Sequence, residues 1–153
     1  MRSLIITRAS DAEHEWAAHL MSASEPWITL RRSFPECYKA CTDEACTLYV
    51  AHDENQSCGF ILLHPRGVAG SPYVRSIAVA PEFRGKGVGC CLLGFAEDLF
   101  RDNARYIFLC VSSFNPRARA LYERQGYSVV GELVDYVIDG ASEILMHKRL
   151  VPQ

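Results

Sequence analysis

The chain has 153 residues, of which 49% are hydrophobic and 22% charged, and its net charge is −2. This length and composition are those of one globular domain, so we expect a single domain over residues 1–153. The near-neutral charge argues against a nucleic-acid binder, since such proteins carry a marked basic excess. No apolar run approaches the ~20 residues of a membrane helix, and the first residues lack the apolar core of a signal peptide. We therefore expect a cytoplasmic protein with no nucleic-acid or membrane partner.

The first half of the chain is predicted to contain four strands and at least two helices. Ser10 and Glu13 have the spacing of a capping box, which predicts the start of a helix. Pro26 and Pro35 interrupt the stretch that follows, and the Pro- and Gly-rich segment 64–72 is expected to be a loop. The expected elements are a strand at 4–6, a helix over about 10–22, one or two short helices within 27–40, a hairpin of strands at 46–51 and 58–63, and a strand at 73–79.

The second half adds two helices and three strands. Apolar residues at helical spacing from Val88 to Leu99 predict one helix, and Asn115 and Gly126 are suited to begin and end another. The expected strands lie at 106–111, 127–134 and 143–150, the last two on either side of a turn at Asp139-Gly140. This order of elements predicts an α/β (α+β) fold with a mixed sheet.

Seven cysteines is a high and odd number for this length. In a chain without a secretory signal, the simplest expectation is reduced, mostly packed thiols. A zinc site at Cys37, Cys41 and Cys46 is the alternative, but these residues form no C-x-x-C pair and have no histidine close by in the sequence. A catalytic cysteine would need a base that the sequence does not identify. We therefore predict no metal.

The chemistry concentrates in a glycine-rich turn between a predicted strand and a predicted helix. Gly85, Gly87 and Gly89 alternate at the mouth of the helix, where unpaired backbone N–H groups can cradle a phosphate. Arg84 and Lys86 add positive charge at the same place. The G-x-G-x-x-G and P-loop patterns are both absent, and a turn that binds no ligand remains the plain alternative.

Two motifs carry a resemblance to a known family. The segment Arg84–Gly89 matches R/Q-x-x-G-x-G/A, and Asn115, Ala118 and Tyr122 match N-x-x-A-x-x-x-Y, about 30 residues further on. Both resemble the GNAT superfamily of acetyl-CoA-dependent N-acetyltransferases, whose fold has a mostly antiparallel central sheet flanked by helices. The resemblance covers residues 44–150 well, whereas the first 43 residues match only in the pattern of elements.

The resemblance implies roles for particular residues. The strand before the turn would pair with the pantetheine arm of acetyl-CoA through its backbone, and the turn would wrap the pyrophosphate. The cofactor-binding residues that it implies are Ile77, Ala78 and Val79 on the strand, Arg84, Gly85, Lys86, Gly87, Val88 and Gly89 in the turn, and Asn115 near the pantetheine. Asn115 is also explained as a plain helix N-cap.

Tyr122 would lie near the thioester sulfur as the general acid, although a tyrosine packed in the core is the alternative. Only a neutral amine attacks a thioester, so the enzyme must remove a proton from the acceptor ammonium. Ribosomal-protein alanine acetyltransferases of this superfamily place a glutamate on the strand before the asparagine, and Cys110 stands at that position here. This departure puts both the base and that substrate in doubt.

Other candidate groups for the acceptor side come from scattered positions. The candidates for the general base are His64, Glu132 and Asp135, and the candidates for an aromatic acceptor pocket are Trp27, Tyr73 and Tyr136. Residues 84–124 carry 7 basic and 4 acidic residues, a local excess that suits an anionic cofactor.

The resemblance thus predicts an enzyme that transfers the acetyl group of acetyl-CoA to the primary amine of a small molecule, by direct attack in a ternary complex. A protein or peptide N-terminal acetyltransferase is the first alternative, because the segment from Asp135 to Met146 loosely resembles the late strands of those enzymes. A non-catalytic acyl-CoA-binding module is the second. A homodimer is a possible assembly.

Overall fold

The computed structural model describes residues 3–150. A seven-stranded sheet runs through the molecule in the order β1-β2-β3-β4-β5-β7-β6, and every neighbouring pair is antiparallel except β4 and β5. This arrangement confirms the predicted mixed, mostly antiparallel α/β (α+β) architecture. The strands are β1 (Ile5–Arg8), β2 (Thr47–Asp53), β3 (Gln56–Val68), β4 (Ser71–Val79), β5 (Tyr106–Ser112), β6 (Ser128–Leu133) and β7 (Glu143–Arg149).

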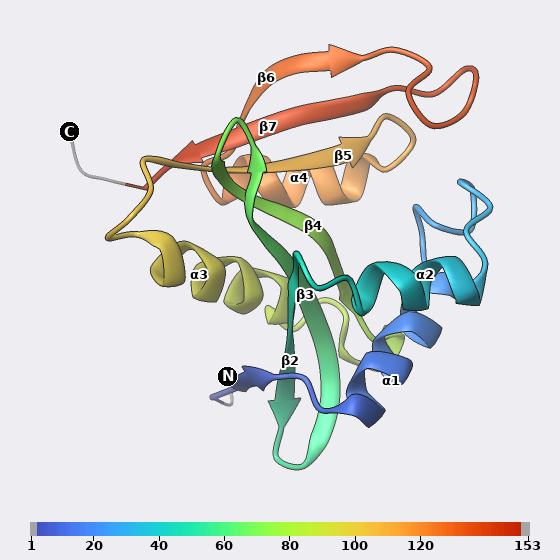
Figure 1. The fold of residues 1–153 in the computed structure, drawn as a ribbon, viewed down its shortest axis with the longest axis vertical. Helices are drawn as coiled ribbons and strands as arrows, with labels where there is room; N and C mark the ends of the chain where they lie inside the picture. The colour runs from blue at the N-terminus through green and yellow to red at the C-terminus, as the bar shows by residue number, and fades with distance from the viewer. Residues whose placement is uncertain (1–2, 151–153) are drawn as a thin grey trace.

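Helices cover the sheet on both sides (Figure 1). The helices are α1 (Asp11–Ser22), α2 (Phe34–Cys41), α3 (Val88–Phe100) and α4 (Pro116–Arg124). One apolar cluster joins α1 and α2 to residues of β2, β3 and β4, and a second, larger one joins α3 and α4 to residues from both halves of the sheet. The face of β5, β7 and β6 that lies opposite α4 carries no helix in Figure 1.

The predicted start of α1 is confirmed in detail. The Ser10 hydroxyl accepts from the backbone N–H of Glu13, and the Glu13 carboxylate accepts from the backbone N–H of Ser10. A second capping box, formed by Ser33 and Glu36, begins α2. The prediction that Pro35 interrupts this region was wrong, because Pro35 lies in the first turn of α2, where its missing N–H has no helical partner to lose.

The predicted loop over residues 64–72 was also wrong. Strand β3 continues to Val68 and β4 begins at Ser71, so a long hairpin replaces the loop. Its turn contains Ala69 and Gly70, which both have positive φ, as a two-residue turn of type I′ requires. The register shifts between His64 and Val68, and prolines are tolerated at such irregularities.

The last half of α3 differs from its predicted pattern. Val88, Leu92 and Ala96 are buried as expected, but Leu99 is 43% exposed. Glu97 is buried instead, with its carboxylate 2.7 Å from the Lys148 ammonium and 3.1 Å from the Tyr127 hydroxyl. This ion pair ties α3 to β7, because its two partners stand on these elements.

The position of the candidate site follows from the pairing of β4 with β5. Only two pairs join these parallel strands, Tyr73 with Phe108 and Val74 with Leu109. Arg75 then forms a bulge, because Leu62 pairs with Ser76 and Leu63 with Val74. Beyond the bulge β4 stays with β3 and β5 stays with β7, so the two strands part.

We expect Lys148→Met to lower the free energy of unfolding by about 3 kcal/mol, because it leaves the Glu97 carboxylate buried without its cation. Urea denaturation measures the loss. Arg119→Met is the matched control, since it removes one partner of an exposed pair with Glu123 and should cost no more than about 0.5 kcal/mol. Equal losses in the two variants would show that the buried pair is not a significant tie.

Candidate active site

The parting of β4 and β5 leaves the end of β4 with one strand neighbour. Ile77, Ala78 and Val79 pair with β3 on one side, and no pair with β5 is formed after Val74. Apart from the Val79 carbonyl, which accepts from the Arg84 side chain, backbone groups that face the open side can bind an extended polar chain. The structure therefore presents, at the predicted residues, an edge of the kind that a pantetheine arm could pair with.

The glycine-rich turn follows directly from this edge. The chain makes one 3-10 turn at Pro81–Phe83 and then enters α3 with Gly87 as its N-cap. Gly85 and Gly87 have φ values of 74° and 85°, a conformation that favours glycine. No side chain caps the first turn of α3, so its backbone N–H groups are available to an anion. These features fit the pyrophosphate of a CoA cosubstrate.

Gly89 brings three elements together at the start of α3. A Cβ atom at this position would lie 3.2 Å from Leu121 on α4 and 4.0 Å from Val79 at the end of β4. A larger side chain would push α4 away from α3. The glycine thus lets the free end of β4, the turn and α4 meet, and these are the elements that carry the two sequence motifs.

The two basic residues of the turn differ in their contacts. The Arg84 Nε donates to the Val79 carbonyl at 3.0 Å, and its Nη2 lies 3.5 Å from the Ser24 hydroxyl. Part of this guanidinium is therefore already engaged with the chain. Lys86 is exposed, with its ammonium 5.7 Å from the Phe83 ring centroid. The other basic residues of the segment are more dispersed than its net charge suggests, since Arg101 follows the far end of α3.

The second motif lies on α4. Asn115 is its N-cap, and the side-chain oxygen accepts from the backbone N–H of Ala118 at 3.4 Å. Tyr122 is 7% exposed and its ring packs edge-on against Tyr127. No buried side-chain polar atom lacks a partner within residues 3–150, and the Tyr122 hydroxyl makes no hydrogen bond there, so this hydroxyl reaches the surface. Burial raises the pKa of Tyr122 to about 12, which keeps a proton available at neutral pH.

A polar cluster occupies the other face of the sheet at the same point. Leu109 and Val111 pack in the core with α3 and α4, so Cys110 points to the opposite face. Its thiol interacts with the hydroxyl of Tyr73, which stands at the last pairs between β4 and β5. Burial raises the pKa of both groups, so both stay protonated at neutral pH. This environment does not favour a thiolate at Cys110.

Two residues that the sequence analysis did not select complete this cluster. Ser112 donates a hydrogen bond of 2.6 Å to the Glu143 carboxylate, and the two residues face each other on β5 and β7. The alternation of β5 indicates that Ser112 shares a face with Cys110, and this could have been read from the sequence. Nothing in the sequence indicates that Glu143 stands opposite it.

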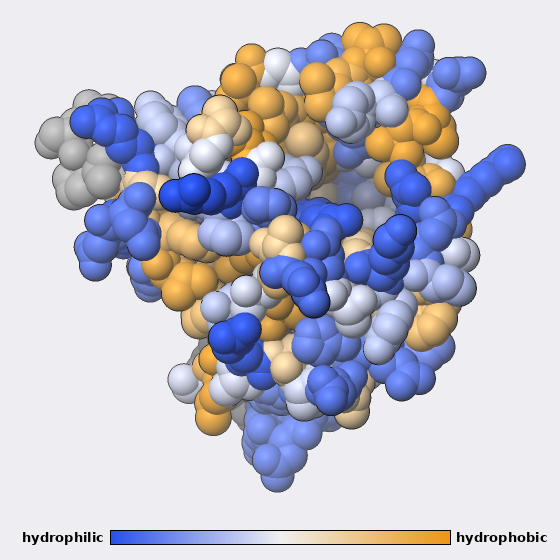
Figure 2. Space-filling model, viewed as in Figure 1, coloured by the Kyte–Doolittle hydropathy of each residue, from blue (hydrophilic) through white to orange (hydrophobic). Residues whose placement is uncertain are grey.

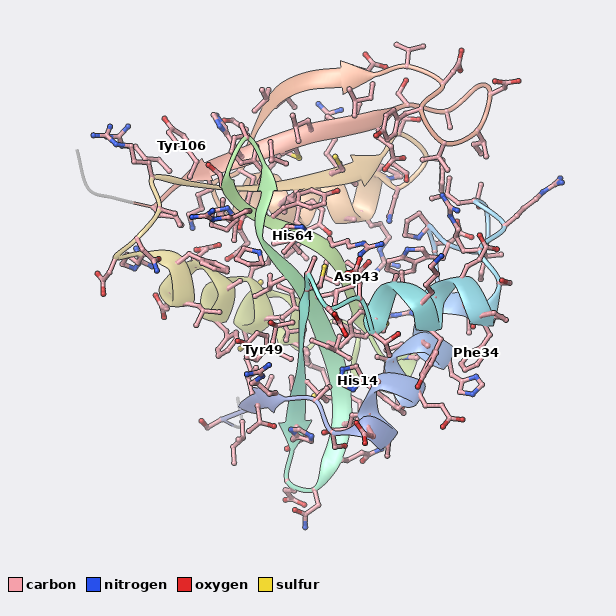
Figure 3. All side chains as sticks on the ribbon, in the orientation of Figure 1. His14, Phe34, Asp43, Tyr49, His64 and Tyr106 are labelled. Carbon is pink, nitrogen blue, oxygen red and sulfur yellow. The ribbon has the colours of Figure 1, made fainter. Side chains whose placement is uncertain are left out.

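The three predicted candidates for the base lie in different environments. His64 pairs with Tyr73 and so shares its face, and its ring interacts with Asp43 (Figure 3). Glu132 pairs with Ile144, which packs in the core with α3 and α4, so Glu132 points away from the cluster. Asp135 accepts from the backbone N–H of Gly140 at 2.7 Å and closes its loop.

The three aromatic candidates for the acceptor pocket also lie in different parts of the structure. Tyr73 lies in the polar cluster described above. Trp27 lies between α1 and α2, where it is half-buried and packs against the apolar cluster of these helices. Tyr136 is 68% exposed in the loop between β6 and β7. In Figure 2 the surface is hollowed between the end of β5 and α2, on the face that carries the polar cluster.

All seven cysteines are free. Within the described part of the chain, no group of three or more His, Cys, Asp or Glu residues could hold a metal ion. No helix among residues 3–150 is long and apolar enough to cross a membrane.

An unpaired strand edge, a glycine turn at a helix without a side-chain cap and a tyrosine hydroxyl on a neighbouring helix are features that fit an acyl-CoA-dependent transferase. The sequence profile of the acetyltransferase (GNAT) family matches residues 10–127. The chain belongs to this family and is an acetyl-transferring enzyme. Enzymes of the family use acetyl-CoA, which agrees with the features of the turn and the strand edge.

Curated relatives agree with this assignment. An uncharacterized N-acetyltransferase of Methanocaldococcus jannaschii is 34% identical over 118 residues, which are 76% of this chain and 68% of that protein. The S-alkylcysteine N-acetyltransferase of Bacillus subtilis is 33% identical over 86 residues, 54% of this chain and 47% of that one. The N-alpha-acetyltransferase of Saccharolobus solfataricus is 38% identical over 80 residues, 51% and 48% of the two chains.

Solved structures share the fold. The ribosomal-protein-S18-alanine N-acetyltransferase of Escherichia coli superposes with a TM-score of 0.80 at 18% identity, over 99% of this chain and 96% of that one. At this level of identity the likeness concerns the fold alone.

We expect Cys110→Ala to retain acetyl transfer close to that of the unmodified protein, because the protonated thiol supplies neither a nucleophile nor a base. Release of CoA in the presence of a saturating amine measures the rate, and Cys110→Ser controls for the loss of volume. A loss of orders of magnitude in both variants would instead make Cys110 a catalytic residue.

Proposed function

We propose that this protein transfers the acetyl group of acetyl-CoA to the primary amine of a small molecule, by direct attack within a ternary complex. The observation that carries the proposal is the parting of β4 and β5, which opens the sheet between two chemically different faces. On one side lie the glycine turn, the helix α3 without a side-chain cap, and Tyr122. On the other lie Tyr73, Cys110 and Glu143.

The first step is the binding of acetyl-CoA along the free edge. The backbone of Ile77, Ala78 and Val79 would pair with the pantetheine amides, and the turn from Arg84 to Gly89 would receive the pyrophosphate on backbone N–H groups. Lys86 is free to contact a phosphate oxygen. Asn115, at the start of α4, would contact the pantetheine from the side. This leaves the thioester in the gap between the two strands.

The second step is attack by the amine from the opposite face. The nitrogen lone pair forms a bond to the thioester carbonyl carbon, and the C–S bond breaks. Tyr122 would give its proton to the leaving thiolate and regain one from the nitrogen, which loses an N–H proton as the amide forms. Its raised pKa keeps Tyr122 protonated before the reaction. No residue needs to carry the acetyl group, and the protonated state of Cys110 agrees with a direct transfer.

An α-amino group is the acceptor that we favour. Two relatives, the S-alkylcysteine and the N-alpha-acetyltransferases, are named for transfer to amines of this kind. About one peptide α-amine in ten is neutral at pH 7, compared with roughly one in a few thousand for a lysine amine, and the α-amine of a free amino acid lies between the two. A free amino acid is our first candidate. The N-terminus of a peptide is the second, favoured by the relative from Saccharolobus solfataricus.

An acceptor screen tests the proposal. Acetyl-CoA is incubated with free amino acids including S-methylcysteine, with polyamines and with short peptides, and released CoA is read with a thiol reagent against a blank for the protein's seven cysteines. Turnover with amino acids supports the first candidate, and turnover with peptides alone supports the second. Tight acetyl-CoA binding without turnover on any amine would contradict the proposal.

The position of the pyrophosphate is tested by Gly87→Glu. The new carboxylate would stand at the N-terminus of α3, where it repels phosphate, and we expect calorimetry to show acetyl-CoA affinity falling by more than about tenfold. Gly94→Glu is the matched control. It adds the same charge to the middle of α3, where a Cβ atom meets nothing within 4 Å. Equal affinities of the two variants would place the pyrophosphate elsewhere.

The role of Tyr122 is tested by its replacement with phenylalanine. We expect Tyr122→Phe to lower kcat by about a hundredfold, within the range that general acids contribute, with little change in acetyl-CoA affinity. Tyr127→Phe removes a hydroxyl from the neighbouring ring and its bond to Glu97, so it should affect stability more than kcat. An unchanged kcat in Tyr122→Phe would exclude the general-acid role.

A further inference from the structure

The proton acceptor for the amine is the part of the reaction that the features above leave unassigned. A base must lie on the face from which the amine approaches, close to the gap between β4 and β5. Cys110 stands nearest to this gap on β5, but its thiol is protonated and is not a base at neutral pH. The group must therefore come from another strand.

Glu143 places a carboxylate at this point from β7. It pairs with Ser112, two residues beyond Cys110, and paired residues of antiparallel strands share a face. The diagonal from Glu143 to Cys110 is therefore about 7–8 Å between backbone positions, within reach of a glutamate side chain. Its negative charge acts on both the Cys110 thiol and the Tyr73 hydroxyl, so the carboxylate lies near both groups.

The carboxylate is held in place by a short network. Ser112 donates to one of its oxygens at 2.6 Å. The start of β7 is fixed to the end of β5, because the Ser113 N–H donates to the Ser142 carbonyl at 2.8 Å and the Ser142 N–H donates to the Ser113 hydroxyl at 3.0 Å. Among the described residues Glu143 makes no ion pair, so its charge remains available to a cation.

Other candidate groups near this face already have partners or point elsewhere. Asp43 forms an ion pair with Arg75 at 2.8 Å, and Asp135 closes its own loop. Glu132 points to the opposite face of the sheet. His64 shares the face, but its Nδ1 accepts from the backbone N–H of Arg66 at 3.1 Å, and it stands on β3, two strands from β5.

We infer that Glu143 binds the acceptor ammonium and takes its proton. This inference rests on the proposed function. The carboxylate accepts one proton from the ammonium, and the freed lone pair attacks the thioester carbonyl carbon. The C–S bond breaks, and the thiolate takes a proton. The nitrogen loses its second proton as the amide forms, and Glu143 returns its proton to water, so the reaction releases one proton overall.

The test compares Glu143→Gln with the unmodified protein on S-methylcysteine, or on the best acceptor of the screen, from pH 7 to pH 9. Glutamine keeps an oxygen that accepts from Ser112, so the hydrogen bond is retained while the base is lost. We expect kcat/KM to fall by about a hundredfold or more at pH 7. The deficit should shrink by roughly tenfold or more by pH 9, because the neutral fraction of the amine, which needs no base, rises steeply between these two pH values.

Neighbouring groups do not account for such a trend. Burial raises the pKa of Tyr73 and of the Cys110 thiol, the pKa of Arg75 is raised by its partners and that of Asp43 is lowered by its own, so all four shifts are directed away from this range. His64 is tested separately by His64→Asn, in which we expect the pH dependence of the unmodified protein. The residue opposite Glu143 on β6 is the apolar Leu133.

Glu132→Gln is the matched control, since it removes a carboxylate from the next strand on the other face, and we expect no change in kcat/KM. Acetyl-CoA affinity of Glu143→Gln should equal that of the unmodified protein, and Glu143→Asp should recover part of the activity. A deficit of equal size at pH 7 and pH 9 would make Glu143 structural and overturn the inference. An unmodified protein that acetylates no amine would instead overturn the proposed function itself.

Discussion

The two-residue contact between β4 and β5 is the constraint on which the rest of the site depends. Parallel pairing holds Tyr73 and Val74 against β5, and the bulge at Arg75 then turns β4 away. Beyond the bulge the end of β4 packs on both faces, with Ala78 in the cluster of α1 and α2 and with Ile77 and Val79 against the cluster of α3 and α4. These contacts hold the end of β4 in place beside the gap.

The gap between β4 and β5 has groups of different chemistry on its two sides. An anionic cosubstrate needs backbone N–H groups and a glycine turn, which α3 and the end of β4 supply on one side. In the proposed reaction a cationic amine needs a negative group that is not already neutralised, and Glu143 would supply it on the other side. Groups suited to substrates of opposite charge would thus stand on opposite faces, with the thioester between them.

Local sequence patterns predicted most helices and strands. They failed where pairing between strands outweighs the conformational preference of single residues. The capping box at Ser10 and the N-cap at Asn115 depend on neighbours three residues away, and both were found. The loop expected over 64–72 is a hairpin, because pairing with β4 absorbs the prolines at an irregular register. Trp27 was a candidate for the acceptor pocket, yet it packs against the core under α1 and α2, a contact that no local pattern indicates.

The sequence by itself determined the class of fold and singled out the glycine-rich turn, because the motif residues from Arg84 to Gly89 are consecutive. Only the tertiary structure brought the polar cluster together. Ser112 and Glu143 are 31 residues apart and meet only through the register of β5 with β7. A turn is local, and its chemistry can be read along the chain. A cluster across three strands depends on pairing, which the order of residues does not specify.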